Sequence, residues 1–175
     1  ILPILLAACA ARIPAASTEP PTIPPASALP LNLLYKDPNQ PVELRVDDLL
    51  ARMTMDEKIA QMVQPDVNNA LPVSDTSALS LGAVLSTAGS ISETNSLADW
   101  TNIPNTYLQE AIKSRLGIPL LYGVDSMHGF GHVNGATIFP HNIGLGATHD
   151  PDLVEKIGQA VAEEMRAAGI PWSFG

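Results

Sequence analysis

The chain has 175 residues, of which 46% are hydrophobic and 15% are charged, so it is long and apolar enough to bury a core. Its formal net charge is −9 with nine Lys and Arg, which argues against a nucleic-acid partner, because clustered positive charge supplies the affinity for a phosphate backbone. Cys9 is the single cysteine, so neither an intrachain disulfide nor a cysteine-based metal site can form.

Residues 1–11 are apolar and rich in small side chains. They are too short to span a bilayer and are typical of the end of a secretory signal peptide with its cleavage site. Within them, Leu6-Ala7-Ala8-Cys9 resembles a bacterial lipoprotein box, which would make Cys9 the lipidated first residue of the mature protein. The alternative is an ordinary signal peptide that happens to contain a cysteine, or spurious upstream translation. We expect a secreted or periplasmic bacterial protein, tethered to the membrane through Cys9 under the first interpretation.

Residues 12–41 contain recurrent prolines among Ala, Ser and Thr, and we interpret them as an extended, semi-rigid linker without a core of its own. From residue 42 to residue 53 the apolar side chains fall near helical spacing with charged residues between them, which predicts a helix. Thr54 and Glu57 form a capping-box signature that opens a second helix.

We expect Pro65 to end this second helix. Its predicted apolar side consists of Ile59, Met62 and Val63. The methionines of the two helices are expected to pack in the core, and the aspartates of the first helix are expected to face solvent. These residues are Met53, Met55 and Met62, and Asp47 and Asp48.

The next segments alternate between loop, strand and helix. Residues 64–80 are polar and are predicted to form a loop, and residues 82–86 are predicted to form a short buried strand. A helix is predicted over residues 96–115, where Pro104 indicates a bend or an interruption. Gly117 is expected to end this helix.

The apolar run from Ile118 to Val124 predicts a strand that is buried on both faces, as in a parallel sheet. Asp125 follows directly, and then a glycine-rich loop. Asp150 as N-cap and Pro151 at the first helical position predict the start of another helix, and residues 170–174 predict a third strand. This alternation predicts the α/β fold class.

Asp125 is the leading candidate for a functional residue. A carboxylate at the carboxyl end of a buried strand, followed by a loop with Gly129, Gly131 and Gly135, lies where an α/β barrel keeps its substrate-binding side chains. The alternative is a turn-forming aspartate that binds nearby loop amides.

Four histidines raise the question of a metal site: His128, His132, His141 and His149. The first two are four residues apart, as ligands on one helix face would be. The surrounding glycines make a helix unfavourable there, which argues against His128 and His132 as paired ligands on a helix face. We expect neither a metal nor another cofactor. His128 and His141 are expected to tie loop backbone together, and His149 is expected to be exposed.

Trp100 and Trp172 could be stacking platforms for a ligand, because an aromatic face can pack against an apolar ligand face. Trp100 falls in a predicted helix and Trp172 in a predicted strand, so we expect both to pack in the core. Glu163 and Glu164 of the last helix are expected to face solvent.

A family resemblance rests on two segments. They are Gly-Ile-Pro-Leu-Leu-Tyr-Gly-Val-Asp-Ser-Met-His-Gly at residues 117–129 and Gly-Ala-Thr-Ile-Phe-Pro-His-Asn-Ile-Gly-Leu-Gly-Ala-Thr at residues 135–148. Both closely resemble the N-terminal barrel of glycoside hydrolase family 3, and most of all its β-glucosidase and exo-β-glucanase branch. The resemblance implies that residues 42–175 are the N-terminal portion of a (β/α)8 TIM-type barrel, incomplete in this chain, since such a barrel takes about 250 residues.

The resemblance also implies an activity. The full enzyme would be retaining and exo-acting, and it would release terminal β-linked glucose from β-glucosides or β-glucan oligosaccharides. Asp125 matches the family residue that binds hydroxyls of the terminal sugar, so the resemblance implies a substrate-binding role for it. In the family the nucleophile and the acid/base come from later positions, beyond residue 175. We therefore expect no catalytic residue in this chain, and no activity from the chain alone.

The chain departs from the family pattern in three places. Ser126-Met127 replaces a frequent Ala-Val, Phe130-Gly131-His132 replaces a frequent His-Asn-Asn, and Gly175 replaces a usual Ala-Pro. Two alternatives remain open at this point. One is a non-catalytic, carbohydrate-binding surface lipoprotein with a degenerate barrel, and the other is a β-N-acetylglucosaminidase of the same family, whose pattern the chain resembles less well.

Overall fold

The computed structural model describes residues 32–67, 72–87 and 94–174. The chain divides into two units, Ile1–Leu33 and Leu34–Gly175, and every element below belongs to the second. In chain order these elements are η1 (Leu34–Lys36), α1 (Val42–Arg52), α2 (Met55–Gln61), α3 (Val73–Ala78), β1 (Ala83–Ser86), α4 (Leu97–Ala111), β2 (Leu121–Asp125), α5 (Asn142–Gly146), α6 (Pro151–Ala167) and β3 (Trp172–Phe174). Within the described residues, no helix combines the length and the apolar character that crossing a bilayer requires.

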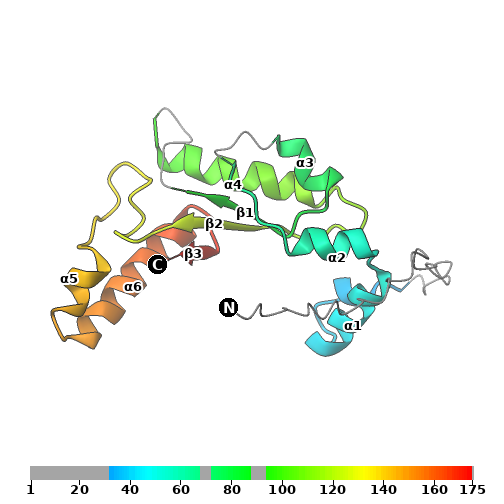
Figure 1. Cartoon of the computed structure of the whole chain (residues 1–175), viewed down its shortest axis with the longest axis horizontal. Helices are drawn as coiled ribbons and strands as arrows, with labels where there is room; N and C mark the ends of the chain where they lie inside the picture. Colours follow the sequence, from blue (N-terminus) through cyan, green and yellow to red (C-terminus); the bar gives the residue numbers. More distant parts are fainter. Residues whose placement is uncertain (1–31, 68–71, 88–93, 175) are drawn as a thin grey trace, which may run out of the picture. The chain divides into compact units, whose positions relative to one another are not determined.

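The strands form a parallel sheet in the order β1-β2-β3, with α4 between the first two strands in sequence and α6 before the third (Figure 1). Ala83 pairs with Leu121 at the start of β1 and β2, and Asp125 pairs with Phe174 at the end of β2 and β3. A parallel bridge between Asp66 and Leu85 adds a short stretch of backbone on the far side of β1. This confirms the predicted α/β alternation around a parallel sheet.

One face of this sheet carries the core. Val84, Ser86, Tyr122 and Val124 are all buried, and their alternation places them on the same face. The Tyr107 ring of α4 lies against the Tyr122 ring, with 5.9 Å between the centroids. Met165 of α6 and Trp100 and Ala111 of α4 belong to the same buried cluster, together with Val67, Leu81, Leu120, Phe130, Ala168 and Ile170.

The opposite face is less covered. It carries Gly123 and Asp125 of β2 and Trp172 and Phe174 of β3, by register and alternation. A Cβ at position 123 would lie only 2.7 Å from Cε2 of Phe174, so any larger residue there would require the aromatic ring to shift. The rings of Trp172 and Phe174 lie 4.7 Å apart, and both side chains are half-buried. Leu121, which shares this face, is 52% exposed. Trp172 therefore meets the core prediction only in part, whereas Trp100 is fully buried as predicted.

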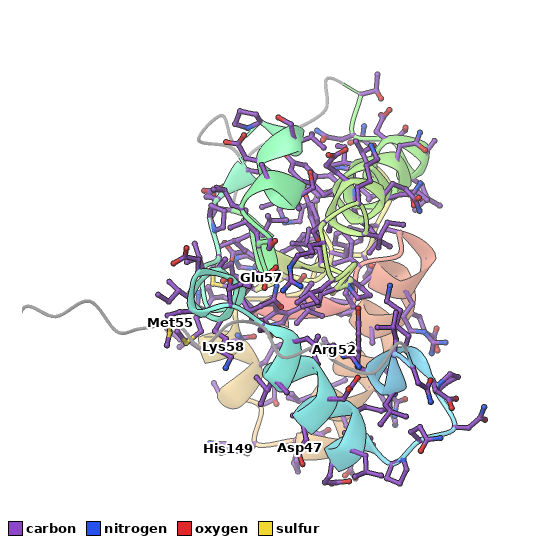
Figure 2. The ribbon with its side chains drawn as sticks, turned by 90° about the vertical axis from the view of Figure 1, so that its right-hand side faces the viewer. Asp47, Arg52, Met55, Glu57, Lys58 and His149 are labelled. Atoms are coloured by element: carbon purple, nitrogen blue, oxygen red, sulfur yellow. The ribbon has the colours of Figure 1, made fainter. Side chains whose placement is uncertain are left out.

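The helices before the sheet follow their sequence signals locally. The capping box is confirmed, because the Glu57 amide donates to Thr54 Oγ1 at 3.2 Å and the Thr54 amide donates to Glu57 Oε2 at 2.9 Å. Arg115, which follows α4, donates to the same carboxylate and lowers the pKa of Glu57. Figure 2 shows Glu57 with its α2 neighbours Met55 and Lys58.

Side-chain burial in this region differs from the prediction. Met55 and Met62 are 67% and 79% exposed, so the expectation that these two methionines pack in the core is wrong. Ile59 and Val63, on the predicted apolar side of the helix, are also exposed. Asp48, which is predicted to face solvent, has a side chain that is only 10% exposed. It accepts from Arg52 Nη2 at 2.7 Å and from the Tyr35 amide at 3.1 Å, and the Arg52 hydrogen bond lowers the pKa of Asp48. Asp47 is exposed, as predicted (Figure 2).

Two short helices lie where the sequence indicates loop. α3 falls inside residues 64–80, and its sequence has no apolar period of its own. Contacts from elsewhere hold it, since Ser77 Oγ donates to Glu110 of α4 at 2.6 Å and the Leu81 amide donates to the Thr76 carbonyl. α5 follows the glycine-rich loop, and His141 caps it by accepting from the Ile143 amide at 3.3 Å.

The later elements match their signals with small shifts. α4 runs without a break through Pro104, which is buried inside it, so the predicted interruption is absent from this helix. Asp150 caps α6, accepting from the Leu153 amide at 3.0 Å, with Pro151 at the first turn. The second and third strands begin later than predicted, at Leu121 and Trp172. Because the three strands are parallel, the carboxyl ends of β1, β2 and β3 lie along one edge of the sheet.

Candidate functional site

Asp125 is the last residue of β2, so its side chain lies at the carboxyl edge of the parallel sheet. The residue is half-buried, and alternation places its side chain on the less covered face, with Trp172 and Phe174. Among the described residues, nothing makes a hydrogen bond or an ion pair with its carboxylate. The alternative interpretation, an aspartate that binds loop amides, therefore finds no such bond in the described part of the chain. The carboxylate is available to accept hydrogen bonds from a ligand.

The backbone of Asp125 has a partner that the sequence did not predict. The Asp125 carbonyl accepts from His132 Nε2 at 2.7 Å. Because a carbonyl can only accept, Nε2 must carry the proton. The His132 ring lies 4.8 Å from the Trp100 ring and 5.8 Å from the Phe130 ring, centroid to centroid. The spacing of the histidines suggested only the metal hypothesis, so this contact between a loop and a strand end was missed.

The loop after β2 is held at several points. Asn134 donates from its backbone to the Asn95 carbonyl at 2.9 Å and from Nδ2 to the Thr94 carbonyl at 2.6 Å. His128 Nδ1 lies 3.2 Å from the Phe139 carbonyl, and the Phe139 amide donates back to the His128 carbonyl at 2.8 Å. The expectation that His128 and His141 tie loop backbone together is confirmed by these contacts and by the cap of α5.

Gly129 is the tightest position of this loop. Its φ of +83° lies in the left-handed region, and a Cβ there would approach the Thr137 carbonyl oxygen to 2.5 Å. The loop therefore needs glycine both for its backbone conformation and for space. Glu164 of α6 also supports the loop, because its Oε1 accepts from the Thr137 amide at 3.0 Å. Its second oxygen is buried, so the prediction that Glu164 faces solvent is wrong, whereas Glu163 is exposed as predicted.

A second carboxylate lies at the same edge of the sheet. Asp66 Oδ2 accepts from Thr87 Oγ1 at 2.6 Å, and Thr87 directly follows β1. Asp66 pairs with Leu85 and Leu85 with Gly123, so Asp66 shares the face of Asp125, two strand positions away. Sequence reasoning assigned Asp66 to a loop, because its stretch of paired backbone is too short to give a periodic signal.

A pair of hydrogen-bonded hydroxyl groups lies on the opposite face of the sheet from Asp125, the face that carries the core. Ser86 Oγ and the Tyr122 hydroxyl lie 2.5 Å apart, and both residues are buried. Burial raises the pKa of Tyr122 to about 12, with the Tyr107 and Asp66 charges acting in the same direction and the Ser86 hydrogen bond opposing it. Tyr122 is therefore protonated at neutral pH and serves as a hydrogen-bonding and packing group.

The histidines of the metal hypothesis lie in different surroundings. His128 lies beside His141, with 5.2 Å between the ring centroids, while His132 lies against Trp100. His149 is exposed, as predicted, and has a positive φ of 53°. The described residues contain no group of three or more His, Cys, Asp or Glu side chains that could hold a metal ion.

A cavity of about 480 Å³ lies between the loop after β2, α5, α6 and the start of β3. Its lining is mainly apolar and includes Met127, Leu145, Ile157 and Met165. Ser126 and Ser173 also line it, and both belong to the helix-covered face of the sheet. Asp125 does not line this cavity, so we place the candidate site on the other face.

Several known proteins are similar to this chain. The crystal structure of the exo-1,3/1,4-beta-glucanase ExoP from a Pseudoalteromonas species is 41% identical with a TM-score of 0.70, over 79% of this chain and 18% of that one. The lysosomal beta glucosidase of Dictyostelium discoideum is 35% identical over 147 residues, which is 74% of this chain and 18% of the relative. The periplasmic beta-glucosidase of Salmonella typhimurium (strain LT2) is 32% identical over 146 residues, which is 82% of this chain and 18% of the relative.

The chain thus spans about one fifth of the length of the relatives that it matches. Residues 54–175 match the glycosyl hydrolase family 3 N-terminal domain, and this range contains all three strands, Asp66 and Asp125. The parallel sheet with alternating helices agrees with the ExoP structure. The chain therefore belongs to glycosyl hydrolase family 3.

Proposed function

We propose that the full-length protein is a retaining, exo-acting β-glucosidase or exo-β-glucanase that releases terminal β-linked glucose. The observation that carries this proposal is the Asp125 carboxylate, which has no partner among the described residues and lies at the carboxyl edge of a parallel sheet. In α/β barrels this edge is where substrates bind. The names of the similar proteins, beta-glucosidases and an exo-beta-glucanase, support the same substrate class.

Asp125 binds the sugar in this proposal and does not attack it. An ionised carboxylate accepts hydrogen bonds from sugar hydroxyls, and such charge-assisted bonds are shorter and stronger than those of neutral acceptors. Retaining glycosidases also need a nucleophile and an acid/base about 5–5.5 Å apart. We propose that both come from residues beyond position 175, as the family resemblance implies, and that those residues also complete the barrel that residues 42–175 begin.

The partly uncovered face of the sheet supports this domain assignment. Leu121, Trp172 and Phe174 share the face opposite the buried cluster, and Leu121 is 52% exposed. In the proposed barrel this face would point into the interior. In a complete barrel, side chains from the other strands fill this interior in layers. The helix-covered face, by contrast, already holds the buried cluster.

Replacing Asp125 by Asn in the full-length protein tests the proposal. The variant keeps the shape of the side chain and removes its charge, so we expect kcat/KM for an aryl β-glucoside to fall by roughly a hundredfold or more, equivalent to about 3 kcal/mol of transition-state stabilisation. Steady-state kinetics on the folded variant measures the effect. Asp152→Asn on the exposed start of α6 serves as the matched control and should leave kcat/KM unchanged. Near-wild-type turnover by Asp125→Asn would contradict the assignment.

We also propose that the protein is secreted or periplasmic and that Cys9 anchors it to a membrane. Cys9 lies outside the described residues, so the proposal is supported by the sequence Leu6-Ala7-Ala8-Cys9 and by the proline-rich stretch that follows. The periplasmic beta-glucosidase among the similar proteins supports the location. Expressing the precursor in a bacterium with labelled palmitate should label the wild type but not Cys9→Ala. Equal labelling of both, or labelling of neither, would reject the anchor.

A further inference from the structure

We propose that His132 is a positioning residue that fixes the direction of the Asp125 side chain by holding its backbone carbonyl; this inference depends on the sugar-binding role proposed for Asp125. The hydrogen bond from His132 Nε2 to the Asp125 carbonyl is 2.7 Å long, within the usual range for a strong N–H···O bond. His132 does not touch the proposed sugar subsite through a bond of its own, so its effect passes through Asp125.

The register of the sheet shows why this carbonyl needs a partner. The Leu121 amide donates to the Gly82 carbonyl, so the odd-numbered residues of β2 direct their backbone groups at β1. The pairing of β1 with β2 ends at Ser86 and Val124. The Asp125 carbonyl points the same way, one step beyond the last pair, and His132 supplies its donor from the loop that follows β2.

The imidazole is itself held in place. Trp100 is fully buried, and its ring packs 4.8 Å from the His132 ring. Trp100 Nε1 donates to Asn95 Oδ1 at 3.2 Å, which ties the indole to the same segment that Asn134 binds. The loop and the start of α4 thus form one support for the donor. The amide side of the same peptide is held by a longer bond, from the Ser126 amide to the Phe174 carbonyl at 3.4 Å. Losing the His132 donor would leave the 125–126 peptide without its shorter bond, at the carbonyl side, and widen the range of directions open to the Asp125 carboxylate.

Two substitutions separate the hydrogen bond from the packing. His132→Phe keeps an aromatic ring against Trp100 and removes the donor. His132→Gln places an amide Nε2 near the imidazole Nε2 and removes the ring. A displacement of about 1 Å at a site can cost up to a hundredfold in rate, so we expect His132→Phe in the full-length protein to lower kcat/KM by about tenfold and His132→Gln to stay within about threefold of wild type.

A double-mutant cycle with Asp125→Asn distinguishes positioning from general structural support. If His132 acts through Asp125, the tenfold effect of His132→Phe should shrink to less than about twofold in the Asp125→Asn background, because the contact that it aligns has already been lost. Equal effects of His132→Phe in both backgrounds would overturn the inference, as would a loss in His132→Gln as large as that in His132→Phe. His149→Asn, at an exposed position whose positive φ suits asparagine, is the control and should leave kcat/KM unchanged.

The cycle also keeps the two proposals apart. Wild-type activity in Asp125→Asn would reject the role of Asp125, and the positioning role of His132 with it. A large loss in Asp125→Asn together with wild-type activity in His132→Phe would reject the positioning role alone. If His132→Phe does not fold, the comparison between His132→Gln and wild type still decides: a loss of tenfold or more despite the retained donor would overturn the inference.

Discussion

At the level of single residues, the candidate site combines a carboxylate that has no hydrogen-bond partner among the described residues with polar groups that are already hydrogen-bonded. Asp125 has no bonded partner among the described residues, whereas Asp66 is bonded to Thr87 and the Tyr122 hydroxyl to Ser86. A ligand can therefore recruit Asp125 without breaking an existing bond. The other groups set the shape and the charge of the sheet edge around it.

Burial of Tyr122 predicts a loss of stability at high pH. Its pKa is about 12 in the folded protein and about 10 when unfolded, so the unfolded state loses the phenolic proton first. The stability that comes from the neutral hydroxyl is complete below pH 10 and is lost as the pH rises toward 12. We expect the free energy of unfolding to fall more steeply over this range in the wild type than in Tyr122→Phe.

Denaturant unfolding at stepped pH values measures this difference in the full-length protein. Tyr35→Phe is the comparison variant, because Tyr35 is only half-buried, although its hydroxyl donates to the Leu116 carbonyl. Parallel pH profiles for wild type and Tyr122→Phe above pH 10 would contradict the prediction.

At the level of helices and strands, the amino end of β1 is positioned by close contact between the end of α2 and residues 80–82, which precede the strand. Gly82 immediately precedes β1, and its amide donates to the Ala60 carbonyl of α2 at 3.3 Å. Gln61 Nε2 donates to the Ser80 carbonyl at 2.8 Å, which closes the same junction. This junction lies between α2 and the strand that leads to Thr87, so the contact also sets where the Asp66–Thr87 pair falls.

Gly82 and Gly158 should respond oppositely to the same substitution. A Cβ at position 82 would lie 2.3 Å from the Gln61 carbonyl oxygen, whereas a Cβ at position 158, inside α6, meets nothing within 4 Å. We expect Gly82→Ala to destabilise the protein by about 1–3 kcal/mol through forced backbone shifts, and Gly158→Ala to stabilise it by about 0.5–1 kcal/mol through helix propensity. Chemical denaturation of the two variants checks both signs, and a neutral Gly82→Ala would show that the end of α2 is not packed tightly against the segment before β1.

At the level of the whole molecule, the chain spans 18% of the length of the Dictyostelium and Salmonella beta-glucosidases and contributes a sheet with one covered face. The less covered face of this sheet carries Asp125 and the Trp172–Phe174 pair. Under the proposed function Asp125 is a single sugar-binding carboxylate, which can supply neither the covalent step nor the protonation of the leaving oxygen. The proposed activity therefore belongs to the full-length protein.

We expect purified residues 1–175 to hydrolyse neither an aryl β-glucoside nor a short β-glucan. We also expect this polypeptide to self-associate. The outer edge of β3 and the apolar side chains of the less covered face would have no partners within it. Assays against a mock-purified control and size-exclusion chromatography measure the two properties. Turnover that survives repurification and disappears in Asp125→Ala would contradict both the proposed division of the site and the role of Asp125.

Local sequence signals were enough to predict most of the elements and the position of Asp125. Each of these signals is carried by neighbouring residues and corresponds to a feature of the structure. They are the caps at Thr54 and Asp150, the apolar run that becomes β2, and the glycines around residue 129. The strand-end placement of Asp125 follows from one such run. The family resemblance added a role for this residue that the local pattern left open.

Side-chain burial and long-range contacts could be learned only from the three-dimensional structure. Ser77 of α3 is bonded to Glu110 of α4, and the Asp48 carboxylate is bonded to Arg52 and to the Tyr35 amide. Met55 and Met62 stay exposed although both are apolar residues, which were expected to pack in the core. The His132–Asp125 bond depends on where a loop folds back over a strand end. Helix caps and strand alternation arise within a few residues of backbone, whereas burial and pairing depend on segments that are distant in the sequence.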